Sequence, residues 1–184
     1  MSTQQIRLSY TLLELWRRGQ INQALDMYFR RKKMPTTPQM LDGIRIHKSV
    51  QNYVLKNNRF PEQVTTIPVN NPEIEKEFIV EYSSQFLIKV KIDLFDTDSF
   101  FELKTGWSDS VRYAREYQVP MYFLVSDIAG FHKEKAYIIH YNQYTKEKDM
   151  TMIWHNKRQI ELAKNYIDSI APDLYNYFNN QSLW

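Results

Sequence analysis

The chain has 184 residues, of which 43% are hydrophobic and 24% are charged, and its formal net charge at pH 7 is +3. These values are typical of a globular domain with one sizeable core, and so small a net charge does not by itself indicate a polyanionic partner. Cysteine is absent, which excludes disulfides, thiolate-bound zinc and iron–sulfur clusters and fits a reducing, cytoplasmic location. The N-terminus lacks the apolar core of a signal peptide and no stretch could span a membrane, so an intracellular protein without a membrane partner is expected.

We expect residues 1–184 to form a single domain whose first part, residues 1–38, is helical. Ser9 can cap a helix that extends to Trp16, and an apolar stripe predicts a second helix from Ile21 to Lys33. Basic residues cluster on these helices: Arg17, Arg18, Arg30, Arg31 and Lys32. Such a cluster can bind the phosphates of a nucleic acid, although a solvated helix face gives the same pattern.

The central part, residues 39–128, is expected to hold a third helix from Pro38 to Asn57 and a strand from Val64 to Val69. An antiparallel pair is predicted from Glu77 to Tyr82 and from Phe86 to Asp96, with a turn at Ser83-Ser84. In the second of these strands apolar and polar residues alternate, which places Asp93 on the polar face.

Beyond Gly106, Ser108 can cap a helix that extends to about Gln118. Met121 to Ser126 is apolar and can continue the helix or form a buried strand, because Pro120 leaves both readings open. The last part, residues 129–184, is expected to form late strands and a C-terminal helix: Lys135 to Tyr141, Met150 to His155, and a helix capped at Asn156. The predicted fold class is α/β with a mixed central β-sheet flanked by helices.

The segment from Lys91 to Gly106 reads as two short strands joined by a turn at Thr97-Asp98. With this loop Asp93 lies opposite Glu102, and Lys104 shares their face. Two facing carboxylates destabilise a sheet unless something compensates, and a hard divalent cation does so while keeping water for chemistry. A lysine beside such a metal can orient or deprotonate the water, or offset charge in a phosphodiester transition state. The pattern therefore predicts a metal-dependent site that cuts phosphodiester bonds, with a solvated surface hairpin as the alternative.

Two pairs of residues, each one helical turn apart, can reach this face. Gly43 precedes His47 by one turn, and the glycine allows a close approach that would bring the histidine to a metal or phosphate. Gln118 precedes Tyr122 by one turn if the helix continues, and these side chains can orient water or contact a nucleic acid. The alternatives are a hydrogen-bonded histidine at the core edge and an ordinary polar helix end beside a core tyrosine.

The remaining candidates carry less information. We interpret His132, His140 and His155 as structural or surface residues, because their spacing is not typical of a shared metal site. Trp107 follows the Lys104-Thr-Gly exit and is a candidate for stacking on a base at the rim. The sequence has no Gly-rich phosphate loop and no Gly-x-Ser-x-Gly motif, which argues against an ATPase and a serine hydrolase.

Taken in chain order, these elements resemble the PD-(D/E)XK nuclease superfamily, in particular its RecB-like branch, which includes CRISPR-associated and viral exonucleases. The resemblance covers about residues 40–125 and rests on an ordered set: Gly43-x-x-x-His47, Ile92-Asp93, Glu102-Leu-Lys104-Thr-Gly and Gln118-x-x-x-Tyr122. It implies a restriction-endonuclease-like core. Pro120 departs from the pattern, since a bend there would displace Tyr122.

The resemblance also implies roles for individual residues. The implied metal ligands are Asp93, Glu102, the backbone carbonyl of Leu103, and His47. The implied catalytic residues, beside Asp93 and Glu102, are Lys104, Gln118 and Tyr122. Mg²⁺ or Mn²⁺ is the implied cofactor, and the absence of cysteine implies a member without the iron–sulfur cluster of many CRISPR-associated relatives.

We therefore expect a metal-dependent DNA nuclease, with exonuclease action on single strands or DNA ends as the first hypothesis and a sequence-specific endonuclease as the alternative. DNA is the expected partner, and a homo-oligomer or a replication or repair complex stays open, as does a viral or mobile-element origin. Two other hypotheses are a catalytically silent nucleic-acid-binding module and a scaffold subunit of a repair, recombination or replication assembly.

Overall fold

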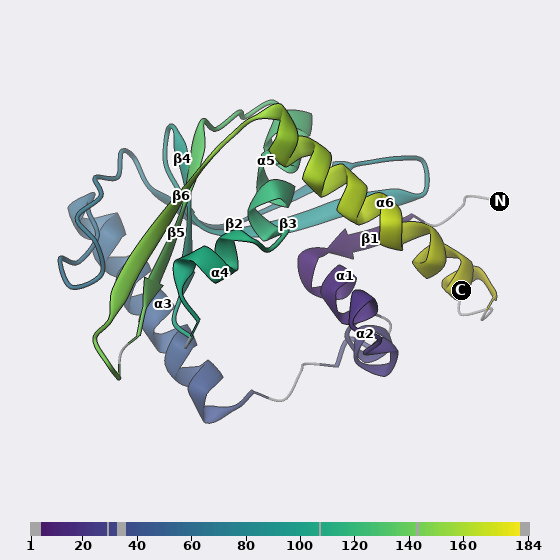
Figure 1. Ribbon diagram of the computed structural model, residues 1–184, viewed down its shortest axis with the longest axis horizontal. Coiled ribbons are helices and arrows are strands. Elements are labelled where there is room, and N and C mark those ends of the chain that lie inside the picture. Colours follow the sequence, from purple (N-terminus) through teal and green to yellow (C-terminus); the bar gives the residue numbers. More distant parts are fainter. Residues whose placement is uncertain (1–4, 29, 33–35, 107, 143, 181–184) are drawn as a thin grey trace.

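The computed structural model describes residues 5–28, 30–32, 36–106, 108–142 and 144–180. Within these residues, six strands form one mixed sheet (Figure 1): β1 (Ile6–Ser9), β2 (Glu73–Glu81), β3 (Phe86–Phe95), β4 (Ser99–Lys104), β5 (Lys135–Tyr141) and β6 (Lys148–Trp154). The helices around it are α1 (Tyr10–Arg17), α2 (Ile21–Tyr28), α3 (Pro38–Asn57), α4 (Ser110–Ala114), α5 (Gln118–Ala129) and α6 (Lys157–Asn180). The expected fold class, a mixed central sheet flanked by helices, is confirmed. None of the described helices has the length and apolarity that a membrane crossing needs.

Strand β3 is the centre of the sheet because it pairs with three other strands. β2 runs antiparallel along it from Leu87 to Phe95. The opposite edge of β3 is shared, since β1 lies parallel to residues 86–89 and β4 pairs antiparallel only at Leu94 and Phe95. β3 and β4 therefore diverge beyond Leu94 and Phe101, and we call the opening between them the fork. Beyond β4 the sheet continues with a parallel β5 and an antiparallel β6.

The N-terminal region differs from the prediction in two places. Ser9 does cap α1, because its hydroxyl accepts from the Leu12 N–H at 3.2 Å, but the strand β1 that precedes the cap was not expected. The second helix ends at Tyr28 rather than continuing to Lys33, which lies outside the described residues. Arg31 has a left-handed backbone with φ of 49°, which no helical residue adopts, so Arg30, Arg31 and Lys32 follow the helix instead of extending it.

The strand predicted from Val64 to Val69 is wrong. Both valines are buried, but the segment forms a turn and irregular backbone whose β pairing is an isolated bridge between Arg59 and Pro68. Its apolar residues fill the space under α3 without joining the sheet.

After β4, the structure corrects one predicted helix and decides between the two alternatives for the segment that follows. The helix expected from Ser108 to Gln118 is α4 alone, which Asp109 caps through the N–H of Arg112 at 2.8 Å. The apolar segment around Met121 is helical and belongs to α5, whose residues from Val119 to Ser126 are all buried. Pro120 falls in the first turn of α5, where backbone N–H groups have no partner within the helix, so it does not interrupt the hydrogen bonding.

Apolar side chains pack on both faces of the sheet. On one face α3 covers Leu94, Phe101 and Leu103. On the other, α1, α5 and α6 cover a larger cluster that contains Ile92 and Phe100. Successive residues of β4 thus point to α3 and α5 in turn, as the pleat of a strand requires. Because α3 and α5 lie on either side of the diverging strands, polar side chains from both helices can reach the fork (Figure 1).

Candidate active site

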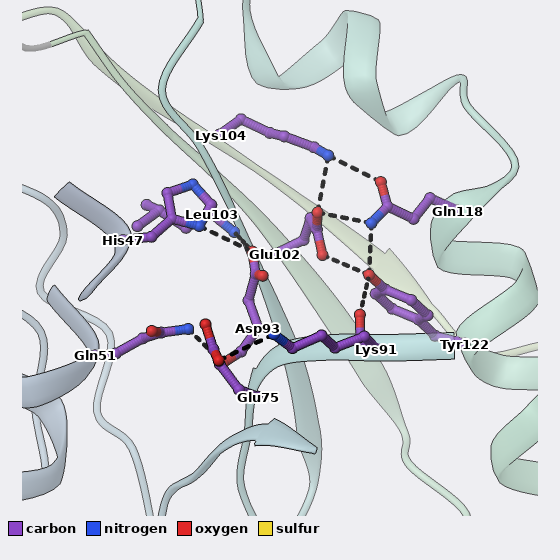
Figure 2. Close-up of polar contacts among 10 residues, drawn as sticks. All are labelled: His47, Gln51, Glu75, Lys91, Asp93, Glu102, Leu103, Lys104, Gln118 and Tyr122. Atoms are coloured by element: carbon purple, nitrogen blue, oxygen red, sulfur yellow. Dashed lines mark hydrogen bonds and ion pairs between the residues drawn. The ribbon is translucent and has the colours of Figure 1, made fainter. Parts of the chain in front are cut away.

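Polar side chains from four elements meet at the fork (Figure 2). β3 and β4 supply Asp93, Glu102 and Lys104, α3 supplies His47 and Gln51, and α5 supplies Gln118 and Tyr122. The structure thus brings together the side chains that the motifs singled out on the four elements.

Glu102 is the centre of this group and is only 5% exposed. Its Oε1 accepts hydrogen bonds from Lys104 Nζ and Gln118 Nε2, each at 2.8 Å. Its Oε2 accepts from the hydroxyl of Tyr122 at 2.7 Å. Burial, followed by the charge of Glu102, raises the pKa of Tyr122 well above its ordinary value, so the phenol stays protonated and acts as a donor. A carboxylate has about four lone-pair sites, so these three bonds leave Glu102 one site for a further ligand.

Lys104 is held as a cation beside this carboxylate. Burial alone would lower its pKa, but the charge and hydrogen bond of Glu102, together with the charge of Asp93, outweigh burial and the pKa is raised. Lys104 Nζ also donates to Gln118 Oε1 at 2.8 Å and lies 5.2 Å from the centre of the Tyr113 ring. In this arrangement the lysine can orient a polar group or offset negative charge, and it is not a free base.

Asp93 faces the fork from the other strand. Its Oδ2 accepts from the backbone N–H of Leu103 at 3.1 Å and lies 3.6 Å from His47 Nδ1, while its own carbonyl accepts from Gln51 Nε2 at 2.9 Å. Burial, followed by the charge of Glu102, raises the pKa of Asp93 well above its ordinary value. A buried and a half-buried carboxylate that face each other are a donor set that a divalent cation fits, because its charge stabilises both anions. The carbonyl of Leu103 also faces the fork, since the N–H and C=O of one strand residue point to the same edge.

A close approach of α3 places His47 at this carboxylate. A Cβ on Gly43 would lie 2.7 Å from Oγ1 of Thr105, so only glycine fits here without displacing its neighbour. Burial lowers the pKa of His47, which favours the neutral imidazole, the form that ligates metals.

Sequence reasoning missed a third carboxylate, Glu75. It lies in β2 directly across from Asp93, between the paired positions Ile74–Leu94 and Lys76–Ile92. Its charge adds to the burial and the Glu102 charge that raise the pKa of Asp93, and its Oε2 lies 3.0 Å from Lys91 Nζ. The predicted strand began at Glu77, but placing the predicted strand ends Tyr82 and Phe86 opposite each other and extending the pairing would have put Glu75 opposite Asp93.

A groove of about 430 Å³ lies beside the fork. One wall is the exposed apolar side of α3 at Met40 and Ile44, and the rim includes His47, Glu75 and Tyr144. This volume is within the range of sites that bind small ligands, so the groove can admit a unit the size of one nucleotide next to His47 and Glu75.

The predicted nucleic-acid-binding cations lie elsewhere. Arg17 and Arg18 both bind Glu14, at 2.9 and 3.1 Å, on their own helix. Arg30 and Lys32 both bind Asp26, at 2.6 and 3.4 Å. Arg31 is exposed. Trp107 lies outside the described residues. Binding of DNA by these residues stays a prediction, and four of them would have to exchange an existing ion pair for a phosphate.

Comparison with known proteins shows which solved structures share this fold. Neither a protein-family model nor a curated protein sequence matches the chain. Among solved structures, a candidate exonuclease from Eubacterium rectale matches with a TM-score of 0.67 and 14% identity, over 95% of this chain and 82% of that one. The alkaline exonuclease LHK-Exo from Laribacter hongkongensis matches with a TM-score of 0.56 and 8% identity, over 96% and 93% of the two chains. Its complex with dAMP matches with a TM-score of 0.57 and 10% identity, over 95% and 92%. At these identities the likeness is one of fold, and the chain has the PD-(D/E)XK nuclease fold that its ordered motifs predicted.

Proposed function

We propose that this protein is a Mg²⁺- or Mn²⁺-dependent deoxyribonuclease of the RecB-like type, acting as an exonuclease on single strands or DNA ends. The observation that carries the proposal is the hydrogen-bonded group of Glu102, Lys104 and Gln118, set across the fork from Asp93. A surface hairpin with solvated acids would not bury these groups or connect them to a second element.

Asp93, Glu102, the carbonyl of Leu103 and His47 would hold the metal. When bound, such an ion lowers the pKa of a coordinated water and offsets the charge of the scissile phosphate. These ligands suit Mg²⁺ or Mn²⁺, because most of the ligand atoms are oxygens. Among the described residues of the fork, Lys104 is the only cation beside the two carboxylates, so they can take a further positive charge.

The remaining side chains of the fork would position the reacting groups. Lys104, as a cation, positions the attacking water and stabilises the negative charge that develops on the phosphate oxygens. Gln118 bonds both Lys104 and Glu102, so it keeps their relative orientation. The Tyr122 hydroxyl donates to the other oxygen of Glu102 and also lies 3.1 Å from the carbonyl of Lys91 on β3, so its single proton is shared between acceptors on the two sides of the fork.

The preference for DNA and for exonuclease action is supported by the comparisons, since the similar structures are described as exonucleases and one of them contains dAMP. The groove lined by His47 and Glu75 supports action on a strand that enters one nucleotide at a time, because its volume suits a single unit.

The test is a gel assay with end-labelled single- and double-stranded DNA, circular single-stranded DNA and RNA, in Mg²⁺, Mn²⁺ or EDTA. Wild type is compared with Glu102→Gln and Lys104→Ala, and the matched controls are Glu77→Gln and Lys89→Ala, which alter an exposed ion pair of β2 and β3. We expect metal-dependent cutting of linear DNA that both fork variants abolish and both controls retain. Circular DNA should resist, because an exonuclease needs an end. DNA binding without cutting by wild type would instead support the silent binding module.

A further inference from the structure

A second cluster of metal-ligating side chains lies away from the fork. Asp127 is in the last turn of α5, His132 follows that helix, and His155 follows β6. His132 Nδ1 lies 2.9 Å from Oδ1 of Asp127, and His155 Nε2 lies 3.0 Å from Oδ2 of the same carboxylate. One ligand atom from each residue falls within 4.8 Å of the other two, although the residues are separated in the sequence.

We propose that Asp127, His132 and His155 form a Zn²⁺ site that fastens the end of α5 to the β5–β6 hairpin. A tetrahedral zinc with bonds of about 2.0–2.2 Å separates its ligand atoms by about 3.4 Å. The two contacts above use different oxygens of Asp127, and one ligand atom from each residue lies within 4.8 Å of the others, so small rotations of the Asp127 carboxylate and of the exposed His132 can bring the three atoms to this spacing.

The surrounding structure holds these ligands in place before any ion binds. The His155 side chain is 14% exposed and packs edge-to-face on Phe123 of α5, with ring centroids 5.0 Å apart. Its backbone N–H donates to the carbonyl of Glu134 at 2.8 Å, which continues the pairing of β5 and β6. At the other end, α5 ends at Gly130 in a left-handed conformation, and the N–H of Phe131 returns to the carbonyl of Ser126 at 3.0 Å. This helix end directs the chain so that His132 comes back over Asp127.

The types of ligand atom in the cluster determine which metal ion fits it. Two imidazoles and one carboxylate suit zinc and its neighbours cobalt and nickel, whereas Mg²⁺ prefers oxygen ligands alone. The His132 side chain is 58% exposed, so water can complete the coordination sphere. Because there is no cysteine in the chain, histidine and carboxylate are the side chains from which it can build a zinc site.

The cluster is separate from the fork. Glu102 of β4 is the register partner of Ile138, whereas the cluster adjoins the end of β5 at Glu134. Four residues of strand separate these positions, which is about 13 Å. The two places can therefore hold separate ions, the fork taking the hard ion and this cluster the zinc.

The test uses the full chain, freed of metal with EDTA and then dialysed. Co²⁺ is added as a spectroscopic probe in the presence of excess Mg²⁺, and Zn²⁺ affinity is measured by competition with a chromophoric chelator. We expect one Co²⁺ per chain with the visible absorption of a four- or five-coordinate ion, displaced by one Zn²⁺. His132→Ala should weaken binding by more than about tenfold, the loss that removal of even an outer partner of a metal ligand causes. His132 is chosen because an exposed side chain can be removed without opening the core.

His47→Ala is the matched control, since it removes the histidine of the fork and should leave Co²⁺ binding unchanged. A second readout is thermal unfolding, where Zn²⁺ should raise the Tm of wild type and of His47→Ala but not that of His132→Ala. Wild type that binds no Co²⁺ would show that the three side chains are only a hydrogen-bonded trio, and would overturn the proposal. Binding lost in His47→Ala but kept in His132→Ala would also overturn it. Neither result depends on nuclease activity.

Discussion

Replacing Gly43 by alanine is expected to lower DNA cleavage by moving His47 away from the fork. The new Cβ would lie 2.7 Å from Oγ1 of Thr105, whereas ordinary contacts begin at 3.4 Å. Either α3 or Thr105, which directly follows β4, must therefore yield by about 0.7 Å. Because a misplacement of about 1 Å at a catalytic group can cost about 100-fold in rate, we expect a loss on the order of tenfold.

A second substitution, at Thr105, tests this contact directly. In Thr105→Ala the clashing oxygen is gone, and the next atom that a Cβ on Gly43 would meet, the Cβ of residue 105, is 4.0 Å away. The double variant should therefore regain the cleavage rate of Thr105→Ala alone. The double variant should also be more stable than Thr105→Ala, because in a helix interior alanine is more favourable than glycine by about 1 kcal/mol.

Single-turnover cleavage and urea unfolding of all four proteins complete a double-mutant cycle. If Gly43→Ala cuts DNA as fast as wild type, the close approach does not set the position of His47. If the double variant is as slow as Gly43→Ala, the defect does not arise from the contact with Thr105. Either result would refute the reasoning.

Three further predictions concern stability. Tyr122→Phe removes a buried hydroxyl bonded to Glu102, so urea unfolding should show a loss of about 1–3 kcal/mol, and an unchanged midpoint would contradict the hydrogen bonding described for α5. Glu75 has a left-handed backbone with φ of 48°, so Glu75→Gly should be more stable in urea than Glu75→Ala by about 1 kcal/mol, the reverse of the usual order in strands. Burial alone would raise the pKa of Glu14, but hydrogen bonds from Arg17 and Tyr166 lower it. A lowered folded-state pKa means that Glu14 stabilises the fold above its unfolded pKa of about 4.3 and loses this effect as the pH falls. The stability difference between wild type and Glu14→Gln should thus be larger at pH 7 than at pH 3, and a difference that does not change with pH would contradict it.

The hairpin of the candidate site could be predicted because its signals are local. The ladder pairs Leu94 with Phe101, the register that a turn at Thr97-Asp98 requires, and α3 runs from Pro38 to Asn57 as expected. Turn residues and period-two alternation set such a register over a few residues. Sequence alone did not show that the strands diverge at Asp93, because this depends on α3 and α5 inserting polar side chains between them.

Elements that depend on distant partners were missed. β1 has four residues, too few to show a period, and it is a strand only because β3 lies beside it, about 80 positions later in the chain. Val64 and Val69 are apolar and buried, but burial does not require pairing in a sheet, so the strand predicted there was wrong. The cluster of Asp127, His132 and His155 was missed for the same reason. Spacing rules detect ligands on one element, and these come from a helix end, a connection and a strand end.

Helix α5 joins the two candidate sites. It presents Gln118 and Tyr122 to the fork from its first turns and Asp127 to the histidine cluster from its last. From Gln118 to Asp127 is about 14 Å along the helix axis, and the residues between are buried, so we expect the helix to move as a rigid body. An ion that fixes Asp127 would restrain the same helix that holds Glu102 and Lys104 in place. Zinc is therefore expected to slow hydrogen exchange of the α5 amides in wild type and not in His132→Ala, whether or not DNA is cut.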